Sequence, residues 1–159
     1  MRRTGLVLAL AVAATLSACG GSTPETSAPP PVAKPAGIPP PPDVAAPPRD
    51  ATTTASGIAW IIIKPGTGTI HPTATSTVRV NYTGWQTNGE MFESTLLGGG
   101  PAEFALNRVI PGWTEGLQLM VFGEKRRFWI PGALAYDTDP DPSKPKGMLV
   151  FDIELIDIR

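Results

Sequence analysis

The stretch from Val109 to Met120 constrains the fold most, because it predicts one short helix in a region where the other clear patterns are those of strands. Pro111 suits the first turn of a helix, where its missing N–H has no helical partner and its fixed φ is already helical. Trp113, Leu117 and Met120 then recur at helical spacing and form one apolar stripe. This stripe needs a partner surface, and the surrounding strands predict a sheet folded over the single helix.

Strand patterns lie on both sides of this helix. Val78, Val80 and Tyr82 alternate with polar residues, which predicts a strand with one buried face. Asn88-Gly89 is a strong hairpin signal, and it folds the next strand back beside this one. The predicted strands lie at residues 57–64, 78–82, 91–94, 102–106, 125–130 and 148–158. We therefore expect an α+β fold, with an antiparallel sheet of four to six strands wrapped around one short helix.

The N-terminus has the order of a secretory signal. Two arginines precede an apolar run at residues 6–16, which is too short for a membrane span of about 20 residues. The run ends in the sequence LSAC at Cys19, which resembles the bacterial lipobox, where a peptidase cuts before a lipid-modified cysteine. We expect a signal peptide at 1–18 and lipidation of Cys19, with palmitate among the acyl chains. Ordinary secretion with a free thiol, which Leu16 disfavours, and a cytosolic protein with an apolar N-terminus are the alternatives.

Residues 19–51 have the composition of a linker. They hold 11 of the 19 prolines of the chain, and no aromatic residue occurs before Trp60. A segment like this cannot bury enough apolar surface to offset its ordering entropy, so we expect a disordered spacer with polyproline character. Proline motifs that bind the aromatic groove of a partner are the alternative interpretation.

Residues 52–159 hold all the aromatic residues and are expected to form one domain of ordinary size. In this range 9 Lys and Arg balance 11 Asp and Glu, which gives no reason to expect nucleic acid as a partner. We interpret the one basic run, at residues 125–127, as the solvated end of a strand.

The residue types needed for metal or nucleophilic chemistry are scarce. Cys19 and His71 are the only cysteine and histidine, so they cannot build a metal cluster or a Ser/His/Asp set. Asp137, Asp139 and Asp141 have the spacing of a calcium loop, but proline and methionine stand where an EF-hand needs glycine and glutamate. We interpret these aspartates as turn residues. An enzyme built from this domain is expected to work without a metal, a cofactor or a covalent nucleophile.

Five short motifs occur in one order along the chain. They are VNYTG at 80–84, GEMFES at 89–94, VIPGW at 109–113, LAY at 134–136 and LVFD at 149–152. In this order the chain resembles the FKBP-type peptidyl-prolyl cis-trans isomerases over nearly all of residues 56–157. The resemblance implies an antiparallel sheet around a short helix, rotamase activity and no cofactor.

The resemblance also implies an apolar pocket. The residues that it implies in catalysis are Tyr82, Phe92, Glu93, Tyr136 and Phe151. Those that it implies in substrate binding are Phe104, Val109, Ile110 and Trp113. In the family a backbone N–H, here that of Ile110, and a tyrosine hydroxyl, here that of Tyr136, hold the carbonyl oxygens of the substrate. Without the resemblance Trp113 is more simply a core residue, and with it the indole becomes the pocket floor.

Three positions depart from the family. Glu93 stands where the family usually has aspartate, and Ala102 stands where some members carry a second aromatic residue. The loop at 131–147 is shorter than in small single-domain members, and Asp137 replaces a usual glycine. These departures are expected to alter the rim of the pocket, and with it the substrate preference or the activity.

The function expected from the whole sequence is the isomerisation of X-Pro bonds in exported proteins, by a monomer anchored through Cys19 in the bacterial cell envelope. The expected partners are proline-containing polypeptides and a membrane. Gly20 is not the aspartate that retains some lipoproteins in the inner membrane, which favours the outer membrane facing the periplasm. The alternatives are a non-catalytic binding or chaperone module for proline-containing segments, and a structural lipoprotein. The sequence names no client protein.

Overall fold

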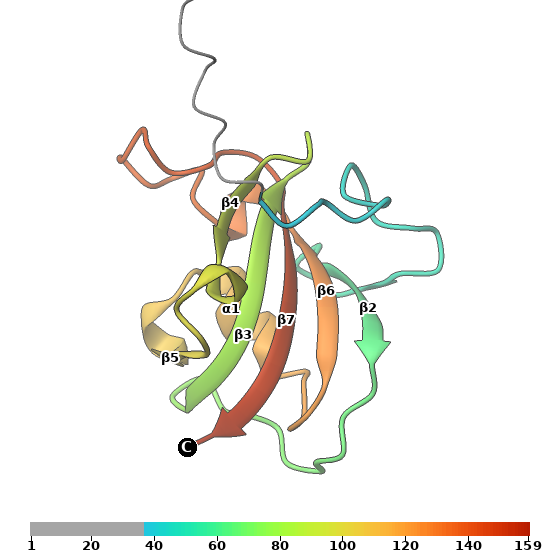
Figure 1. Cartoon of the computed structure of the whole chain (residues 1–159), viewed down its shortest axis with the longest axis vertical. Coiled ribbons are helices and arrows are strands. Elements are labelled where there is room, and N and C mark those ends of the chain that lie inside the picture. The colour runs from blue at the N-terminus through green and yellow to red at the C-terminus, as the bar shows by residue number, and fades with distance from the viewer. Residues whose placement is uncertain (1–36) are drawn as a thin grey trace, which may run out of the picture. The chain divides into compact units, whose positions relative to one another are not determined.

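The computed structural model describes residues 37–159. Within them the chain forms a seven-stranded antiparallel sheet, one α-helix and three short 3-10 helices (Figure 1). The strands are β1 (Thr52–Thr53), β2 (Ala59–Lys64), β3 (Thr77–Gln86), β4 (Met91–Ser94), β5 (Ala102–Ala105), β6 (Lys125–Ile130) and β7 (Leu149–Ile158). The helices are α1 (Pro111–Leu117), η1 (Thr95–Leu97), η2 (Leu106–Arg108) and η3 (Gly132–Leu134). The predicted fold class is confirmed, with seven strands in place of four to six.

Helix α1 begins at Pro111, as predicted, and ends at Leu117, three residues before the predicted end at Met120. After Leu117 the chain forms two i→i+3 backbone hydrogen bonds, and these tighter turns replace the last α-helical turn. Trp113, Leu117 and Met120 are all buried, so the predicted apolar stripe is confirmed although its last member lies beyond the α-helix.

Strands β3 and β7 form the spine of the sheet, with ten residues each and antiparallel pairing along nearly their whole length. The strand order is β1-β2-β6-β7-β3-β4, and β5 also pairs with β3. Register shifts after Arg79 and after Gly84 mark bulges in β3, which increase its local bend. The predicted hairpin is confirmed, because Gly89 takes a positive φ of 87° between β3 and β4.

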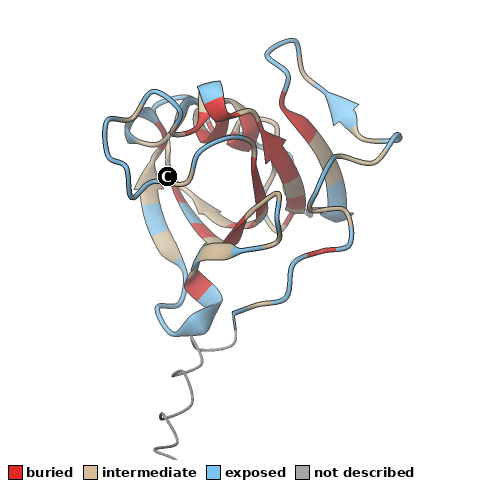
Figure 2. Cartoon of the chain, turned by 90° about the horizontal axis from the view of Figure 1, so that it is seen from above, coloured by how far each residue is buried: buried red, intermediate tan, exposed pale blue. Residues whose placement is uncertain are grey.

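The main core lies between the concave face of the sheet and α1 (Figure 2). Alternate residues of the long strands point into it, as their period predicts. Its largest strand residues are Val78, Val80, Tyr82, Phe128, Ile130, Leu149, Phe151, Ile153 and Leu155. The helix is therefore enclosed by the sheet that its apolar stripe required.

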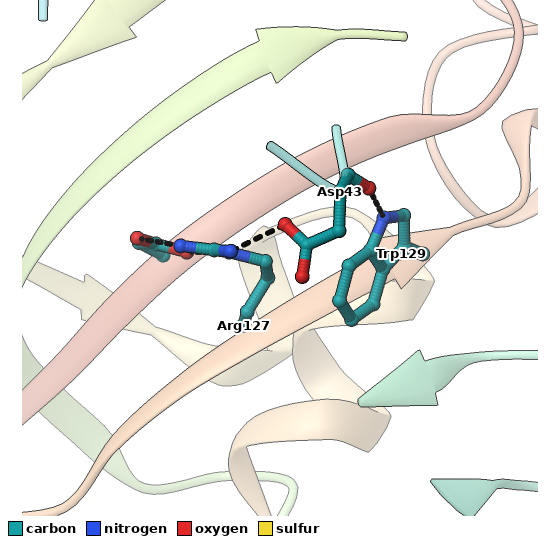
Figure 3. A network of polar contacts seen from close by, with 4 residues as sticks. Asp43, Arg127 and Trp129 are labelled. Atoms are coloured by element: carbon teal, nitrogen blue, oxygen red, sulfur yellow. Dashed lines mark hydrogen bonds and ion pairs between the residues drawn. The ribbon is translucent and has the colours of Figure 1, made fainter. Parts of the chain in front are cut away.

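The other face of the sheet is covered by the N-terminal strap, which we define as residues 37–51. Trp129 donates its indole N–H to the backbone carbonyl of Asp43 at 3.0 Å. Arg127 binds the Asp43 carboxylate on one side and, through two hydrogen bonds, the Asp152 carboxylate on the other (Figure 3). Val44 packs against a small second core around Trp129. The strap is thus fixed to β6 and β7 by both polar and apolar contacts.

A second tryptophan fixes the start of the strap, because Trp85 donates its indole N–H to the carbonyl of Ile38 at 3.0 Å. The prediction of a structureless linker up to residue 51 is therefore wrong for residues 37–51. The composition of the strap did not indicate that it is ordered. Its polar contacts use backbone carbonyls and one carboxylate, which leave no apolar period in the sequence. The predicted signal peptide, Cys19 and the linker before residue 37 lie outside the described residues. No helix among residues 37–159 is long and apolar enough to cross a membrane.

The interpretation of residues 125–127 as a solvated strand end is wrong. Arg126 is only 7% exposed and pairs with Glu124, which is 2% exposed. Arg126 also donates to the carbonyl of Leu119 just beyond α1, and its guanidinium stacks on Trp60 with 4.1 Å to the ring centroid. The pair therefore links the end of the helical segment to β6, and it stays buried because both charges have partners.

Candidate active site

A cavity of about 570 Å³ opens beside α1 on the concave side of the sheet. Its apolar lining comes from β3, β5, α1, β7 and the segments next to the helix and η3. These residues are Tyr82, Phe104, Val109, Ile110, Trp113, Ala135, Tyr136 and Phe151. Pro140 and the polar residues Glu93, Arg108, Thr138, Asp139 and Lys144 contribute the rest of the wall. The size and lining are those of a site for a small apolar group.

Trp113 is the centre of an edge-to-face aromatic cluster. Its ring centroid lies 4.9 Å from that of Tyr82 and 5.5 Å from those of Phe104 and Phe151. Phe92 extends the cluster by packing edge-on against Phe151 at 5.6 Å. Each such pair adds roughly 0.5–1.5 kcal/mol beyond area burial, so the walls of the cavity hold one another in place.

The pair of Phe92 and Phe151 requires a glycine beneath it. A Cβ at Gly84 would lie 2.5 Å from the Phe92 ring and 2.9 Å from the Phe151 ring. No side chain fits there without moving an aromatic ring. Gly84 therefore lets two rings from different strands meet at the edge of the cavity.

The indole N–H of Trp113 is buried and has no hydrogen-bond partner within residues 37–159. The residue is only 5% exposed. An unpaired buried donor costs about 1–3 kcal/mol, and such groups are uncommon in native structures. Trp113 therefore belongs to the cavity wall, while its indole N–H is buried away from solvent.

The two tyrosines of the cavity keep their protons well above neutral pH. Burial, followed by a hydrogen bond to Glu93 and the negative charge of Glu93, raises the pKa of Tyr82 far above its ordinary value. Burial also raises the pKa of Tyr136, and the charges of Glu93 and Asp139 add to the effect. Both phenols are therefore hydrogen-bond donors at neutral pH and do not act as bases.

Among the described residues, the wall of this cavity includes no histidine or cysteine. Within residues 37–159 no three His, Cys, Asp or Glu side chains lie close enough to hold a metal ion. His71 is exposed and does not line the cavity. The arrangement can bind an apolar group, keep water away from it and donate hydrogen bonds to oxygen atoms.

A family model for FKBP-type peptidyl-prolyl cis-trans isomerases matches residues 68–156, which is more than half of the chain. The chain belongs to this family. It is 49% identical over 108 residues to the isomerase FkpA of Aeromonas hydrophila, a match that covers 67% of this chain and 40% of the relative. It is 42% identical over 106 residues to the outer membrane protein MIP of Legionella longbeachae, covering 65% of this chain and 45% of the relative. The chain thus spans less than half the length of these relatives.

Two solved FKBP structures have the same fold. The crystal structure of FkpA from Escherichia coli aligns with a TM-score of 0.65 at 37% identity, covering 70% of this chain and 53% of that one. AtFKBP13 aligns with a TM-score of 0.63 at 29% identity, covering 69% of this chain and 99% of that one. The FKBP assignment made from the five sequence motifs is confirmed.

The structure brings the sequence-predicted FKBP residues together around Trp113. Eight of the nine line the cavity directly: Tyr82, Glu93, Phe104, Val109, Ile110, Trp113, Tyr136 and Phe151. Phe92 is the exception, because it lies behind Phe151 and lines a neighbouring groove. Their catalytic and binding roles remain predictions.

Other wall residues were not predicted from the FKBP motifs. Arg108 comes directly before the VIPGW motif, and its position there could have indicated that it reaches the cavity. Thr138, Asp139 and Lys144 lie in the loop after Tyr136, and no sequence pattern indicates how this loop folds. The cavity wall therefore carries charge of both signs.

This loop is held by its own polar side chains. The Lys146 ammonium donates to the carbonyls of Tyr136 and Asp139 at 2.7 Å each. Asp137 accepts the N–H of Gly147, and the Asp139 carboxylate accepts the N–H of Asp141. The interpretation of these aspartates as turn residues is confirmed. No sequence pattern indicates that Lys146 crosses the loop and fixes the backbone of Tyr136.

Proposed function

We propose that the protein is a peptidyl-prolyl cis-trans isomerase that acts on proline-containing segments of exported polypeptides. The observation that carries this proposal is the aromatic cluster around Trp113, which lines a cavity large enough to take a prolyl ring in an FKBP domain. The name of the relative FkpA, an FKBP-type peptidyl-prolyl cis-trans isomerase, supports the same reaction.

The proposed mechanism needs no covalent step. The barrier of about 18–20 kcal/mol to rotating an amide comes from resonance between its nitrogen and carbonyl. The planar amide is more polar than the twisted one, so transfer into an apolar cavity raises its free energy more than that of the twisted form. The walls around Trp113 would supply this transfer, and a substrate bound as a turn would already be oriented for rotation.

Two hydrogen-bond donors are free to orient the substrate. Neither the backbone N–H of Ile110 nor the hydroxyl of Tyr136 takes part in a hydrogen bond within residues 37–159. Both groups belong to the cavity wall. We assign them to the carbonyl oxygens that flank the rotating bond. Glu93 accepts a hydrogen bond from Tyr82, and in this role it keeps the ring of Tyr82 in place.

The proposed location is the bacterial cell envelope, with the chain anchored by a lipid on Cys19 and most simply in the outer membrane facing the periplasm. A cysteine at the end of an apolar N-terminal run supports this location, and so does the name of the MIP relative, an outer membrane protein. We further propose that the domain acts as a monomer. Expression of a Cys19→Ala variant tests the anchor. If the anchor is on Cys19, the variant protein should be lost from the membrane fraction or its signal peptide should stay uncleaved. Unchanged membrane fractionation would exclude it.

Turnover of a short proline peptide by the full chain tests the activity. We expect catalysed cis-trans exchange above the uncatalysed rate. Peptide binding without turnover would instead support the alternative of a binding or chaperone module. A chain that neither binds nor turns over the peptide would contradict both proposals.

A further inference from the structure

A second cavity, of about 620 Å³, lies next to the pocket, and we call it the flanking groove. Its walls come from the start of the strap, the hairpin between β3 and β4, η1 and the loop after Tyr136. Its apolar lining is Ile38, Pro39, Pro40, Met91, Phe92, Leu97 and Pro145, and Gln86, Glu90 and Ser143 add polar groups. The groove is about as large as the pocket itself.

The flanking groove and the pocket are separated by a wall of two packed aromatic rings. Phe92 lines the groove, and its ring packs against Phe151, which lines the pocket, with 5.6 Å between centroids. In the loop, Lys144 faces the pocket, while its neighbours Ser143 and Pro145 face the groove. A chain that leaves the pocket across this wall therefore enters the groove directly.

The lining indicates what the groove would hold. Its walls are mainly proline, isoleucine, methionine, phenylalanine and leucine, which favour apolar side chains. Leu97 is 54% exposed, so a large apolar side chain stands open to solvent at this point. Exposed apolar surface that adjoins a ligand site is typical of a surface that binds more of the same ligand.

The geometry points to a subsite for the substrate polypeptide: the flanking groove binds an apolar side chain a few residues away from the proline that occupies the pocket. This inference rests on the proposed isomerase function. An extended chain advances about 3.3–3.6 Å per residue, so residues roughly two to four positions from the proline can cross the Phe92 wall. Long unfolded segments with an apolar residue near the proline are therefore preferred over short peptides.

Leu96 provides a matched control for Leu97. The two residues are neighbours in η1 and are equally exposed, at 55% and 54%. Leu96 does not line the flanking groove but lines a smaller cavity of about 70 Å³, together with Lys125 and Asp152. A change at either position removes the same exposed side chain, and only the one at Leu97 touches the groove.

The test measures kcat and KM of the full chain with five peptides. One is a four-residue proline peptide, and the other four are the same peptide extended by four residues at one end or the other, with leucine or with serine in the extension. We expect leucine in one of the two extensions to lower KM about three- to tenfold relative to serine. Leu97→Ser should remove this gain, and Leu97→Met should keep it. Leu96→Ser should keep the gain as well. The turnover of the short peptide should stay unchanged.

The outcomes separate the inference from the proposed function. No turnover of the short peptide by the unmodified chain would overturn the isomerase proposal itself. Normal turnover with equal KM values for the leucine and serine extensions at both ends would overturn the subsite alone. An equal loss in Leu96→Ser and Leu97→Ser would also overturn it. A change in sedimentation with Leu97→Ser and none in KM would show that the groove binds a second copy of the chain.

Discussion

The two faces of the sheet bury tryptophans in different ways. On the outer face, Trp129 and Trp85 each donate an indole N–H to a carbonyl of the strap at 3.0 Å. On the concave face, Trp113 is almost as deeply buried, yet its indole N–H has no partner within residues 37–159. The same side chain thus completes a hydrogen bond where the strap covers it, and has none at Trp113, which lines the cavity.

This difference separates stability from function. A buried donor with a partner contributes to the folded state, whereas one without a partner costs free energy. The indole hydrogen bonds of the outer face are therefore expected to contribute to folding stability, and the cavity around Trp113 to control turnover. The predictions below test this division, from the largest expected effect to the smallest.

Removing the strap should have the largest effect. We expect a chain of residues 52–159 to be less stable than one of residues 37–159 by about 4 kcal/mol, because two indole donors lose their acceptors and the surface around Trp129 is exposed. Urea unfolding measures this difference. Equal midpoints for the two chains would mean that the strap contacts contribute nothing to folding.

Replacing one tryptophan on each face tests the division directly. Trp129→Phe should lower the free energy of unfolding by about 2–3 kcal/mol, because it leaves the Asp43 carbonyl unpaired, and should leave turnover unchanged at temperatures where the protein is folded. Trp113→Phe removes an unpaired donor, so its loss of stability should be smaller, about 1 kcal/mol. Its turnover should fall about three- to tenfold because the floor of the cavity recedes.

These two variants are compared by urea unfolding and by the peptide assay on the same samples. The division between the faces fails if Trp129→Phe lowers turnover of the folded protein as much as Trp113→Phe does.

Much of this arrangement could be predicted from the sequence, and the reasons differ between the faces. The helix stripe of Trp113 and the alternation of Val78 and Val80 are periodic, so the core and the family were predictable. The strap was not, because Trp129 and Trp85 bind backbone carbonyls, which every residue carries.

The residues of the cavity wall also differ in how far the sequence predicts them. Its aromatic residues lie within motifs that mark the family, whereas the path of the loop depends on Lys146 binding two carbonyls. The position of a lysine in a proline-rich loop does not indicate that it binds backbone carbonyls. The paths of the strap and of this loop depend on side-chain-to-backbone hydrogen bonds, and only the structure shows them.

The ion pair of the strap should matter less than its backbone contacts. Asp43→Ala removes the carboxylate that binds Arg127 but keeps the carbonyl that accepts from Trp129. We expect a loss of about 0.5–1 kcal/mol, because the pair is partly exposed and Arg127 keeps Asp152. Urea unfolding at low and high salt measures it. A loss as large as that of Trp129→Phe would place the stability of this face in the charge and not in the indole bond.

A small effect is expected at the position where the chain departs from its family. Glu93→Asp should leave turnover unchanged or raise it, because the shorter carboxylate can still accept from Tyr82. A loss of more than about tenfold, roughly 1.4 kcal/mol in the barrier, without loss of stability would show that the longer side chain is built into this site. The peptide assay and a thermal melt of the same variant decide this.

The central claim is that the concave face works by withdrawing the amide from water, without proton transfer. The raised pKa values of Tyr82 and Tyr136 keep both phenols protonated as pH rises through neutrality, and their deprotonation lies above their ordinary pKa of about 10. Turnover of a peptide without titratable groups, measured on the full chain with folding checked at each point, should therefore be flat from about pH 6 to pH 8.5. A bell-shaped profile across this range in folded protein would mean that a side chain acts as an acid or a base, and it would contradict the account.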